Sequence, residues 1–306
     1  MKKINVAVLG CGHIGAYAVQ GLKLTEDMHL AGILELGCEI PKIQARFPGV
    51  EVVENVSDLS QKPDVVLLAC PTRVVQKAAP TFLKLGINTV DCFDMHGDPF
   101  MALKNTLDPI AKENNAVSVM GSGVDPGAST MIRALFEIWA PTGLTYVNYG
   151  PGMSMGHTVA AKSYAGVKDA LSITRPGRPG VHQRDVYLET EPGVEFSTLT
   201  ETLMKDPYFA HDDVHFFQVE RVAPLVDMGH RIRVARKGGA SGIDNQLLEF
   251  DSQFHNPAST AQVMISSVRA AMSLTPGAHI MLEIPLIHFL PYSVEDVIRK
   301  IGRAHV

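Results

Sequence analysis

A short apolar stretch that runs directly into a glycine-rich turn constrains this chain more than any other feature. Residues 4–9 are nearly all apolar, the pattern of a strand covered on both faces, and the motif G-C-G-H-I-G follows at residues 10–15. A helix is predicted from about His13 to Leu24, and a second apolar strand from Leu30 to Leu34. We expect these elements to form the first βαβ unit of a doubly wound parallel sheet.

The glycine spacing favours a dinucleotide-binding turn over an ordinary structural turn. Gly10 and Gly12 would let the backbone turn tightly and approach a pyrophosphate, and Gly15 would let the helix pack closely on the strand. The helix N-terminus supplies unpaired N–H groups and a positive dipole end. The cofactor-binding residues that we predict are Gly10, Gly12, His13, Ile14, Gly15, Glu35, Pro71 and Thr72.

Glu35 bears on which dinucleotide is bound. It ends the second strand about 20 residues beyond the last glycine of the motif, where a carboxylate accepts hydrogen bonds from the adenosine ribose. The same charge would repel the additional phosphate of NADP, and Leu36 and Gly37 offer no arginine to hold it. NAD is therefore favoured over NADP. The alternative is that Glu35 is solvated and that Lys42 or Arg46 approaches from the next loop.

Strands and helices alternate up to about residue 120. Strands are predicted over 65–69, 87–90 and 116–120, and helices over 74–85 and 99–114, as in a parallel sheet. Beyond residue 123, several of the predicted strands alternate polar and apolar residues. We predict an α/β protein with a Rossmann-type, doubly wound dinucleotide-binding domain over 1–120 and a second, α+β substrate-binding and dimerisation domain over 121–284. The terminal segment 285–306 is expected to pack back on the first domain.

Charge and cysteine content point to a small-molecule partner. The net charge of -5 comes without long charged runs, so neither nucleic acid nor a membrane surface is expected as a partner. The apolar stretch after the first three residues is too short for a signal peptide or membrane span. The four cysteines, expected to be small buried residues in a reducing compartment, favour the cytoplasm. Nothing in the sequence has the ligand spacing of a metal site.

Polar groups are concentrated in three segments: V-D-C-F-D-M-H at residues 90–96, G-V-D-P-G at 123–127 and Y-G-P-G-M-S-M-G-H at 149–157. With matching motifs at 173–174, 181–184, 228–230 and 254–257, the chain resembles the meso-diaminopimelate dehydrogenases over nearly its whole length. The 149–157 run looks most like the shorter branch of that family, whose members also reduce 2-oxo acids to D-amino acids.

The resemblance implies a reaction. Members of this family catalyse reversible, D-centre-selective oxidative deamination, in which hydride passes to a nicotinamide and the resulting imine is hydrolysed to a 2-oxo acid and ammonia. The substrate would be meso-2,6-diaminopimelate or a related D-amino acid, a small zwitterion. The resemblance also implies a homodimer formed through the second domain.

The resemblance also assigns roles to individual residues. Asp94 and Asp125 would be the catalytic pair, which holds the reacting ammonium and helps to remove its proton. The substrate-binding set consists of the backbone around Met155 and Gly156 for the proximal carboxylate, Arg184, Thr174 and His230 for the distal carboxylate, Asn256 for the distal amino group, and Val124 and Tyr149 in the pocket wall. On residue type alone, each aspartate could instead belong to a turn or helix cap. Arg184 is more often a cation on a strand face, His230 a packed core histidine, and Thr174 and Asn256 turn formers.

Three departures from the family keep alternatives open. Val124 stands where members commonly have Trp, Glu35-Leu36-Gly37 replaces the usual arginines, and Arg175 replaces an apolar residue. A related diamino acid or a bulkier D-amino acid is therefore an alternative substrate. Other interpretations are a catalytically inactive dinucleotide-binding sensor and a reductase of a carbonyl or ring imine. The loop at residues 175–180 is either a lid or an ordinary surface loop.

Overall fold

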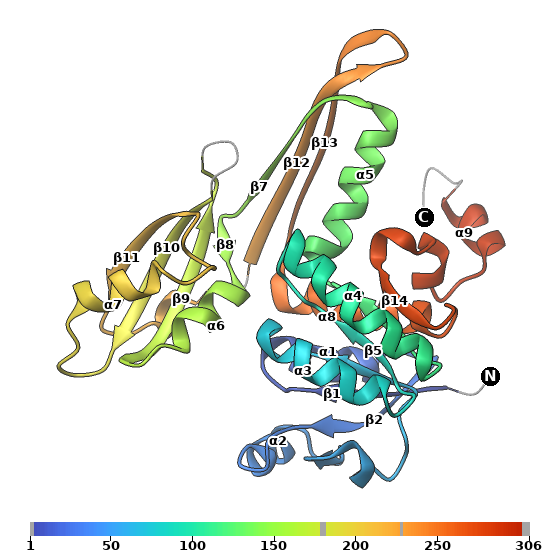
Figure 1. The fold of residues 1–306 in the computed structure, drawn as a ribbon, viewed down its shortest axis with the longest axis horizontal. Helices are drawn as coiled ribbons and strands as arrows, with labels where there is room; N and C mark the ends of the chain where they lie inside the picture. Colours follow the sequence, from blue (N-terminus) through green and yellow to red (C-terminus); the bar gives the residue numbers. More distant parts are fainter. Residues whose placement is uncertain (1–2, 178–181, 227–228, 302–306) are drawn as a thin grey trace. The chain divides into compact units, whose positions relative to one another are not determined.

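The computed structural model describes residues 3–177, 182–226 and 229–301, and these fall into two compact units (Figure 1). The first unit comprises residues 1–131 and 258–306, and the second comprises residues 132–257. The predicted domain limits at 120 and 284 are therefore corrected: the chain leaves the first unit after Met131 and returns to it at Ala258.

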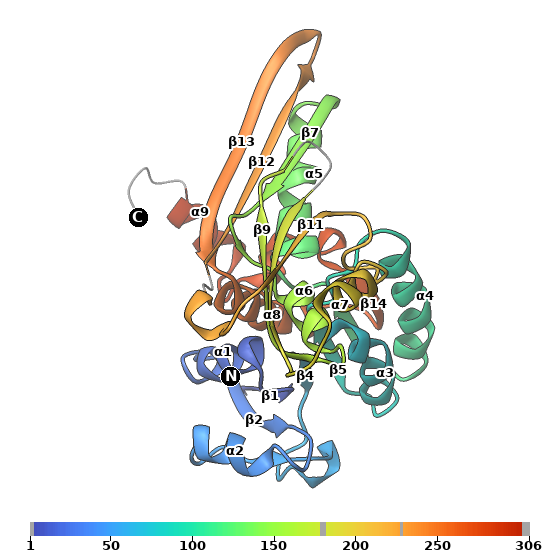
Figure 2. The same cartoon turned by 90° about the vertical axis from the view of Figure 1, so that its left-hand side faces the viewer.

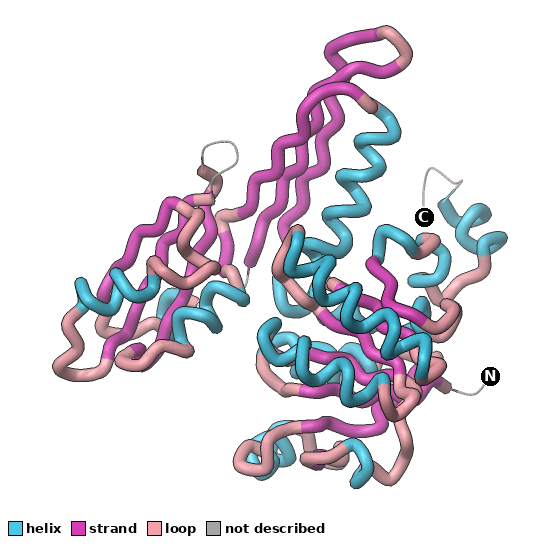
Figure 3. Tube along the Cα trace, in the orientation of Figure 1, coloured by secondary structure: helices cyan, strands magenta, loops and turns pink. Residues whose placement is uncertain are grey.

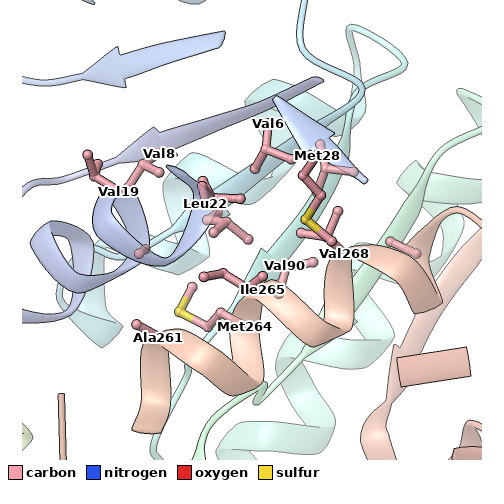
Figure 4. Close-up of a cluster of buried hydrophobic side chains, with 14 of the residues drawn as sticks. Val6, Val8, Val19, Leu22, Met28, Val90, Ala261, Met264, Ile265 and Val268 are labelled. Carbon is pink, nitrogen blue, oxygen red and sulfur yellow. The ribbon is translucent and has the colours of Figure 1, made fainter. Parts of the chain in front are cut away.

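The early return is explained by the packing of helix α8 (Asn256–Ala271). Its side chains Met264, Ile265 and Val268 are buried in one apolar cluster with Val19 of α1, as Figure 4 shows. The 3.6-residue period of a helix places these side chains on one face, whereas the core that this face joins depends on the fold.

The first unit is built on a parallel sheet. Within the described residues it has seven strands in the order β14-β6-β5-β4-β1-β2-β3, and neighbouring strands pair in parallel. The strands are β1 (Ile4–Leu9), β2 (Met28–Leu34), β3 (Val52–Val53), β4 (Val65–Leu68), β5 (Asn88–Asp91), β6 (Val117–Met120) and β14 (Gly277–Ile280). The strand order reverses between β1 and β4, the place where ligands bind in open α/β sheets. The predicted fold class is confirmed.

Helices cover both faces of this sheet, which is why its strands are apolar throughout. One buried cluster joins α1 and α8 to one face, and another joins α3 and α4 to the opposite face. The helices are α1 (His13–Lys23), α2 (Ile40–Arg46), α3 (Thr72–Leu83), α4 (Asp98–Glu113), α8 and α9 (Val294–Ile301), with short turns η1 (Val56–Asp58), η2 (Val124–Ala128), η4 (Met281–Glu283) and η5 (Leu286–Phe289).

The second unit is richer in strands, as the colouring of Figure 3 shows. Its described residues form a four-stranded sheet, β11-β10-β9-β8, and a three-stranded sheet, β13-β12-β7. Strands β12 and β13 lie side by side along their length in Figures 1 and 2. The strands are β7 (Thr142–Tyr149), β8 (Gly152–Met153), β9 (Val167–Arg175), β10 (Gln183–Thr190), β11 (Asp213–Gln218), β12 (Gly229–Ala240) and β13 (Ile243–His255).

Helices α6 (Met155–Lys162) and α7 (Phe196–Leu203) pack on the four-stranded sheet, and α5 (Ser129–Trp139) packs on the three-stranded sheet; a short turn η3 (Ala223–Leu225) follows β11. The sequence predicted neither β9 nor α6. Met155 and Gly156, whose backbone is predicted to bind the proximal carboxylate, are the first two residues of α6.

The burial of the four cysteines differs from the prediction. Of the cysteines, only Cys11 is fully buried, whereas Cys70 and Cys92 are half-buried and Cys38 is exposed, so the prediction of four buried residues was wrong. Over the described residues, no helix combines the length and the apolar character needed to span a membrane.

Candidate active site

The turn after β1 fits the predicted dinucleotide cradle. Gly10 has a φ of +86°, and a Cβ there would lie 2.8 Å from the carbonyl oxygen of Ala69. A Cβ on Gly15 would lie 1.9 Å from the carbonyl oxygen of Gly10, so both positions require glycine. Around Gly12, in contrast, a Cβ would meet nothing within 4 Å. The turn is therefore packed on its inner side and open at Gly12.

Helix α1 begins at this open side. Its N-cap is Gly12, which has no side chain that could cap the first N–H groups. His13 and Ile14 are the first helical residues. The first N–H groups of the helix and its positive dipole end thus meet the open space at Gly12, an arrangement that suits a pyrophosphate.

Glu35 lies next to the same turn, immediately after β2. Its Oε2 accepts a hydrogen bond from the backbone N–H of Cys11 at 2.8 Å, and its Oε1 accepts one from the N–H of Leu36 at 3.0 Å. Burial raises the pKa of the Cys11 thiol, while the positive charge of Arg46 acts in the opposite direction. Arg46 is therefore near enough to act on this turn electrostatically, whereas Lys42 is paired with Glu39 at 3.1 Å.

The other predicted cofactor residues lie where β4 leads into α3. Pro71 is the N-cap of α3 and Thr72 is its first residue. The hydroxyl of Thr72 donates a hydrogen bond to Oδ1 of Asp94 at 2.5 Å. Thr72, which is predicted to bind the cofactor, thus contacts one of the two predicted catalytic acids.

Asp94 and Asp125 follow adjacent strands, β5 and β6, and Asp91 joins the two connecting loops. Oδ1 of the fully buried Asp91 accepts hydrogen bonds from the N–H groups of Phe93 at 3.0 Å and Gly121 at 2.9 Å. Burial raises the pKa of Asp91 to about 6, although these two hydrogen bonds favour its charged form. The loops that carry both predicted catalytic acids are thereby fixed to one buried side chain.

Asp125 has its own partners. Nε2 of His96 lies 3.0 Å from its Oδ2, and the hydroxyl of Ser129 donates a hydrogen bond to its Oδ1. The side chain of Asp125 is 14% exposed and that of His96 is 52% exposed. The imidazole therefore connects a nearly buried carboxylate with solvent. Val124, the residue before this aspartate, begins the turn η2.

In the second unit, Arg184 lies on β10 directly across from Thr174 on β9. Its Nη1 donates a hydrogen bond to the Thr174 hydroxyl at 2.6 Å, and its Nε donates to Oδ2 of Asp212. Burial lowers the pKa of Arg184, which the charge of Asp212 partly offsets. Arg184 and Thr174, which are both predicted to bind the distal carboxylate, thus contact each other, and Arg184 also contacts an acidic residue.

The remaining predicted substrate residues also lie in this unit. Tyr149 has ring contacts with His182 at 5.1 Å and with His230 at 6.4 Å between centroids. Asn256 donates a hydrogen bond from Nδ2 to the backbone carbonyl of Met153 at 3.2 Å. The hydroxyl oxygen of Ser154, the N-cap of α6, lies 2.7 Å from Nδ1 of His157. That histidine therefore positions the start of α6, where the Met155 and Gly156 amides lie.

Comparison with known proteins shows which family the chain belongs to. Residues 4–91 match the oxidoreductase family with an NAD-binding Rossmann fold. A meso-diaminopimelate D-dehydrogenase from Bacteroides fragilis is 43% identical over 296 residues, which cover 97% of this chain and 98% of the relative. This chain belongs to the meso-diaminopimelate D-dehydrogenase family.

Two solved structures share the fold at 22% identity, each with a TM-score of 0.85 over 98% of this chain and 99% of the other. One is the diaminopimelate dehydrogenase of Corynebacterium glutamicum in complex with diaminopimelate, and the other is an engineered D-amino acid dehydrogenase bound to NADP+. The predicted resemblance is confirmed. As a member of this dehydrogenase family, the protein is an amino-acid dehydrogenase with a nicotinamide dinucleotide cofactor.

Several residues of this dehydrogenase were not predicted. His96 and Asp91 stand inside the motif that carries Asp94, but neither their contacts nor their burial can be read from the sequence. Asp212 lies between predicted strands and belongs to none of the motifs that predicted site residues. Arg175 is ion-paired with Asp185 at the end of β9, and residues 178–180 of the predicted lid lie outside the described part of the chain.

Proposed function

We propose that this protein catalyses the reversible oxidative deamination of the D-centre of meso-2,6-diaminopimelate, or of a related D-amino acid, with NAD or NADP. The products are the 2-oxo acid, an ammonium ion, a proton and the reduced dinucleotide, and one water is consumed. The observation that carries the proposal is the acid cluster after β5 and β6, in which Asp94 contacts Thr72 and Asp125 contacts His96. Such a cluster is what a reacting ammonium requires as its partner.

The acids act before hydride leaves the substrate. An ammonium group disfavours loss of hydride from its own carbon, so one proton must first pass from the nitrogen to a carboxylate. Asp94 and Asp125 hold the group, and the nearly buried Asp125 takes its proton. The bound nicotinamide supplies the hydride acceptor. Water then adds to the imine carbon of the substrate, and the C–N bond breaks to release ammonia.

The second unit binds the rest of the substrate. The first N–H groups of α6, at Met155 and Gly156, receive the proximal carboxylate. Arg184 and Thr174 receive the distal carboxylate together with His230, because a buried guanidinium beside a hydroxyl offers several donors in a fixed geometry. Asn256 receives the distal amino group, and Tyr149 lines the part of the pocket that this unit forms.

NAD is the cofactor that we propose. The carboxylate of Glu35 lies beside the turn that carries Cys11, where it suits two ribose hydroxyls and disfavours an additional phosphate. Arg46, whose charge also acts on this turn, is the residue that would weaken this preference.

We also propose a homodimer formed through the second unit. Helix α5 and the sheet β13-β12-β7 carry large apolar side chains with 41–75% exposure, more than a monomer usually leaves in one region: Leu135, Ile138, Trp139, Leu144, Tyr146, Ile243 and Leu247. Light scattering should give the mass of a dimer, and the double variant Ile138→Lys, Leu144→Lys should give that of a monomer. A monomer for the unmodified protein at all concentrations would reject this assembly.

A matrix of substrates and cofactors tests the catalytic proposal. The purified protein should reduce NAD or NADP with meso-2,6-diaminopimelate, and Asp125→Asn should lower kcat by at least about 100-fold, as expected on loss of a proton acceptor. Asp58→Asn, on the exposed turn η1, is the control and should keep full activity. Cofactor binding without turnover of any D-amino acid would instead favour a non-catalytic sensor.

A further inference from the structure

Asp212 is the ionic partner of the guanidinium to which the distal carboxylate is assigned. It lies directly before β11, and its side chain is 15% exposed, against 8% for Arg184. Oδ2 of Asp212 accepts the hydrogen bond from Nε of Arg184. Its Oδ1 lies 3.8 Å from Nδ1 of His182, and Nε2 of His157 lies 3.7 Å from Oδ2.

The guanidinium keeps an edge for a ligand. Arg184 uses Nε for Asp212 and Nη1 for Thr174, and within the described residues its Nη2 donates no hydrogen bond to the protein. The second oxygen of the Asp212 carboxylate, Oδ1, does not take the hydrogen bond from Nε of Arg184 and lies 3.8 Å from Nδ1 of the partly exposed His182. A donor edge and an acceptor oxygen of opposite charge thus lie at the same place in the second unit.

The charge balance of this cluster decides what it can bind. Burial and the neighbouring charge of Arg184 hold the pKa of His157 well below its usual range, so this imidazole is neutral at neutral pH. Arg184 and Asp212 then cancel each other. A lone carboxylate would leave an uncompensated negative charge in a poorly solvated place, which is costly, whereas a group with both carboxylate and ammonium adds no net charge.

We propose that Asp212 is a specificity-determining residue that accepts the distal ammonium of the substrate together with Asn256, while Arg184 and Thr174 hold the distal carboxylate. The distal end is thereby selected as a complete amino-acid group, and substrates with a carboxylate alone at that end are disfavoured. This inference rests on the proposed function, because it assigns a distal subsite to the same reaction.

The alternative role of Asp212 is to hold Arg184 in place and nothing more. The two roles differ in their substrate dependence. D-2-aminopimelate has the same carbon chain and both carboxylates of meso-2,6-diaminopimelate but lacks the distal amino group. A residue that only positions Arg184 serves both substrates equally, whereas a residue that binds the ammonium serves only the diamino substrate.

The test measures kcat/KM of both substrates for the unmodified enzyme, Asp212→Asn and the neighbouring exposed control Asp213→Asn. We expect Asp212→Asn to lower kcat/KM for diaminopimelate by about tenfold or more, the effect of losing a hydrogen-bonded charge pair, and to leave or raise the value for D-2-aminopimelate. Asp213→Asn, which removes an exposed pair with His215, should change neither value.

An equal fall in kcat/KM for both substrates in Asp212→Asn, or no change for either substrate, would overturn the inference while the proposed function stands. The unmodified enzyme gives a second measurement that does not depend on the folding of any variant. Its kcat/KM should favour diaminopimelate over D-2-aminopimelate by at least tenfold, and a ratio near one overturns the inference. Failure to turn over either substrate with NAD or NADP would reject the proposed function and, with it, this inference.

Discussion

Nε2 of His96 lies 3.0 Å from Oδ2 of Asp125, and the imidazole is half-exposed whereas the carboxylate is nearly buried. The pair joins the loop after β5 to the loop after β6, two strands that are neighbours in the sheet. A proton accepted by Asp125 from a substrate ammonium therefore has a titratable group next to it on the way to solvent.

Replacement of His96 should slow turnover. In His96→Asn the carboxylate of Asp125 loses this neighbour, and we expect kcat to fall about tenfold, a modest part of what proton transfer contributes, while KM changes less. Imidazole added to the buffer should restore part of the rate, which a purely structural role would not allow. His29→Asn, at an exposed position of β2, is the control. An unchanged kcat in His96→Asn would show that Asp125 exchanges its proton without this residue.

Glu35→Arg should shift cofactor preference toward NADP. The substitution removes the repulsive carboxylate beside the dinucleotide turn and supplies a donor for a phosphate, so the ratio of kcat/KM for NADP to that for NAD should rise at least about tenfold. Glu39→Arg makes the same charge change at the N-cap of α2 and should move the ratio much less. If the unmodified enzyme already prefers NADP by a wide margin, the electrostatic reasoning about Glu35 fails.

Two glycines of the same turn should respond differently to alanine. Gly15→Ala places a Cβ against the carbonyl oxygen of Gly10, so the free energy of unfolding should fall by about 3 kcal/mol. Gly12→Ala meets no protein atom and should keep its melting temperature, but the added methyl group enters the open side of the turn and should weaken dinucleotide binding. Calorimetric melting and cofactor titration distinguish the two. Equal losses of stability would contradict the packing described for this turn.

The buried carboxyl of Asp91 should make stability depend on pH. Its folded-state pKa of about 6 lies above the unfolded value of 3.8, so the folded protein binds this proton more tightly than the unfolded chain does. The stabilising contribution is complete below pH 4 and is lost as the pH rises to about 6, a change of about 3 kcal/mol for two pKa units.

Asp91→Asn should remove that contribution. Urea unfolding of the variant and of the unmodified protein at pH 4 and pH 7 measures this contribution as the difference between their pH dependences. Other carboxylates with a lowered pKa, such as Asp27, affect the stability of both proteins equally and cancel in this difference. Asp58→Asn is the matched control. The same pH dependence in Asp91→Asn as in the unmodified protein would show that Asp91 stays charged at neutral pH at no cost in stability.

The sequence alone determined the features that depend on short stretches of chain. The apolar run of β1 and the turn at Gly10 and Gly15 predicted a strand, a tight turn and a helix, because these follow from periodicity and from steric limits on the backbone. The contiguous motifs around Asp94 and Asp125 carry the resemblance that predicted the family.

Only the tertiary structure decided which distant groups become partners. The apolar face of α8 follows from its helical spacing, but its burial with Val19 depends on packing across most of the chain. This packing places the limit of the second unit before Ala258. Arg184 was predicted as a carboxylate ligand, yet its pairing with Asp212 depends on how β10 and β11 align. Periodicity and propensity are local properties, whereas charge pairing and burial depend on the whole fold.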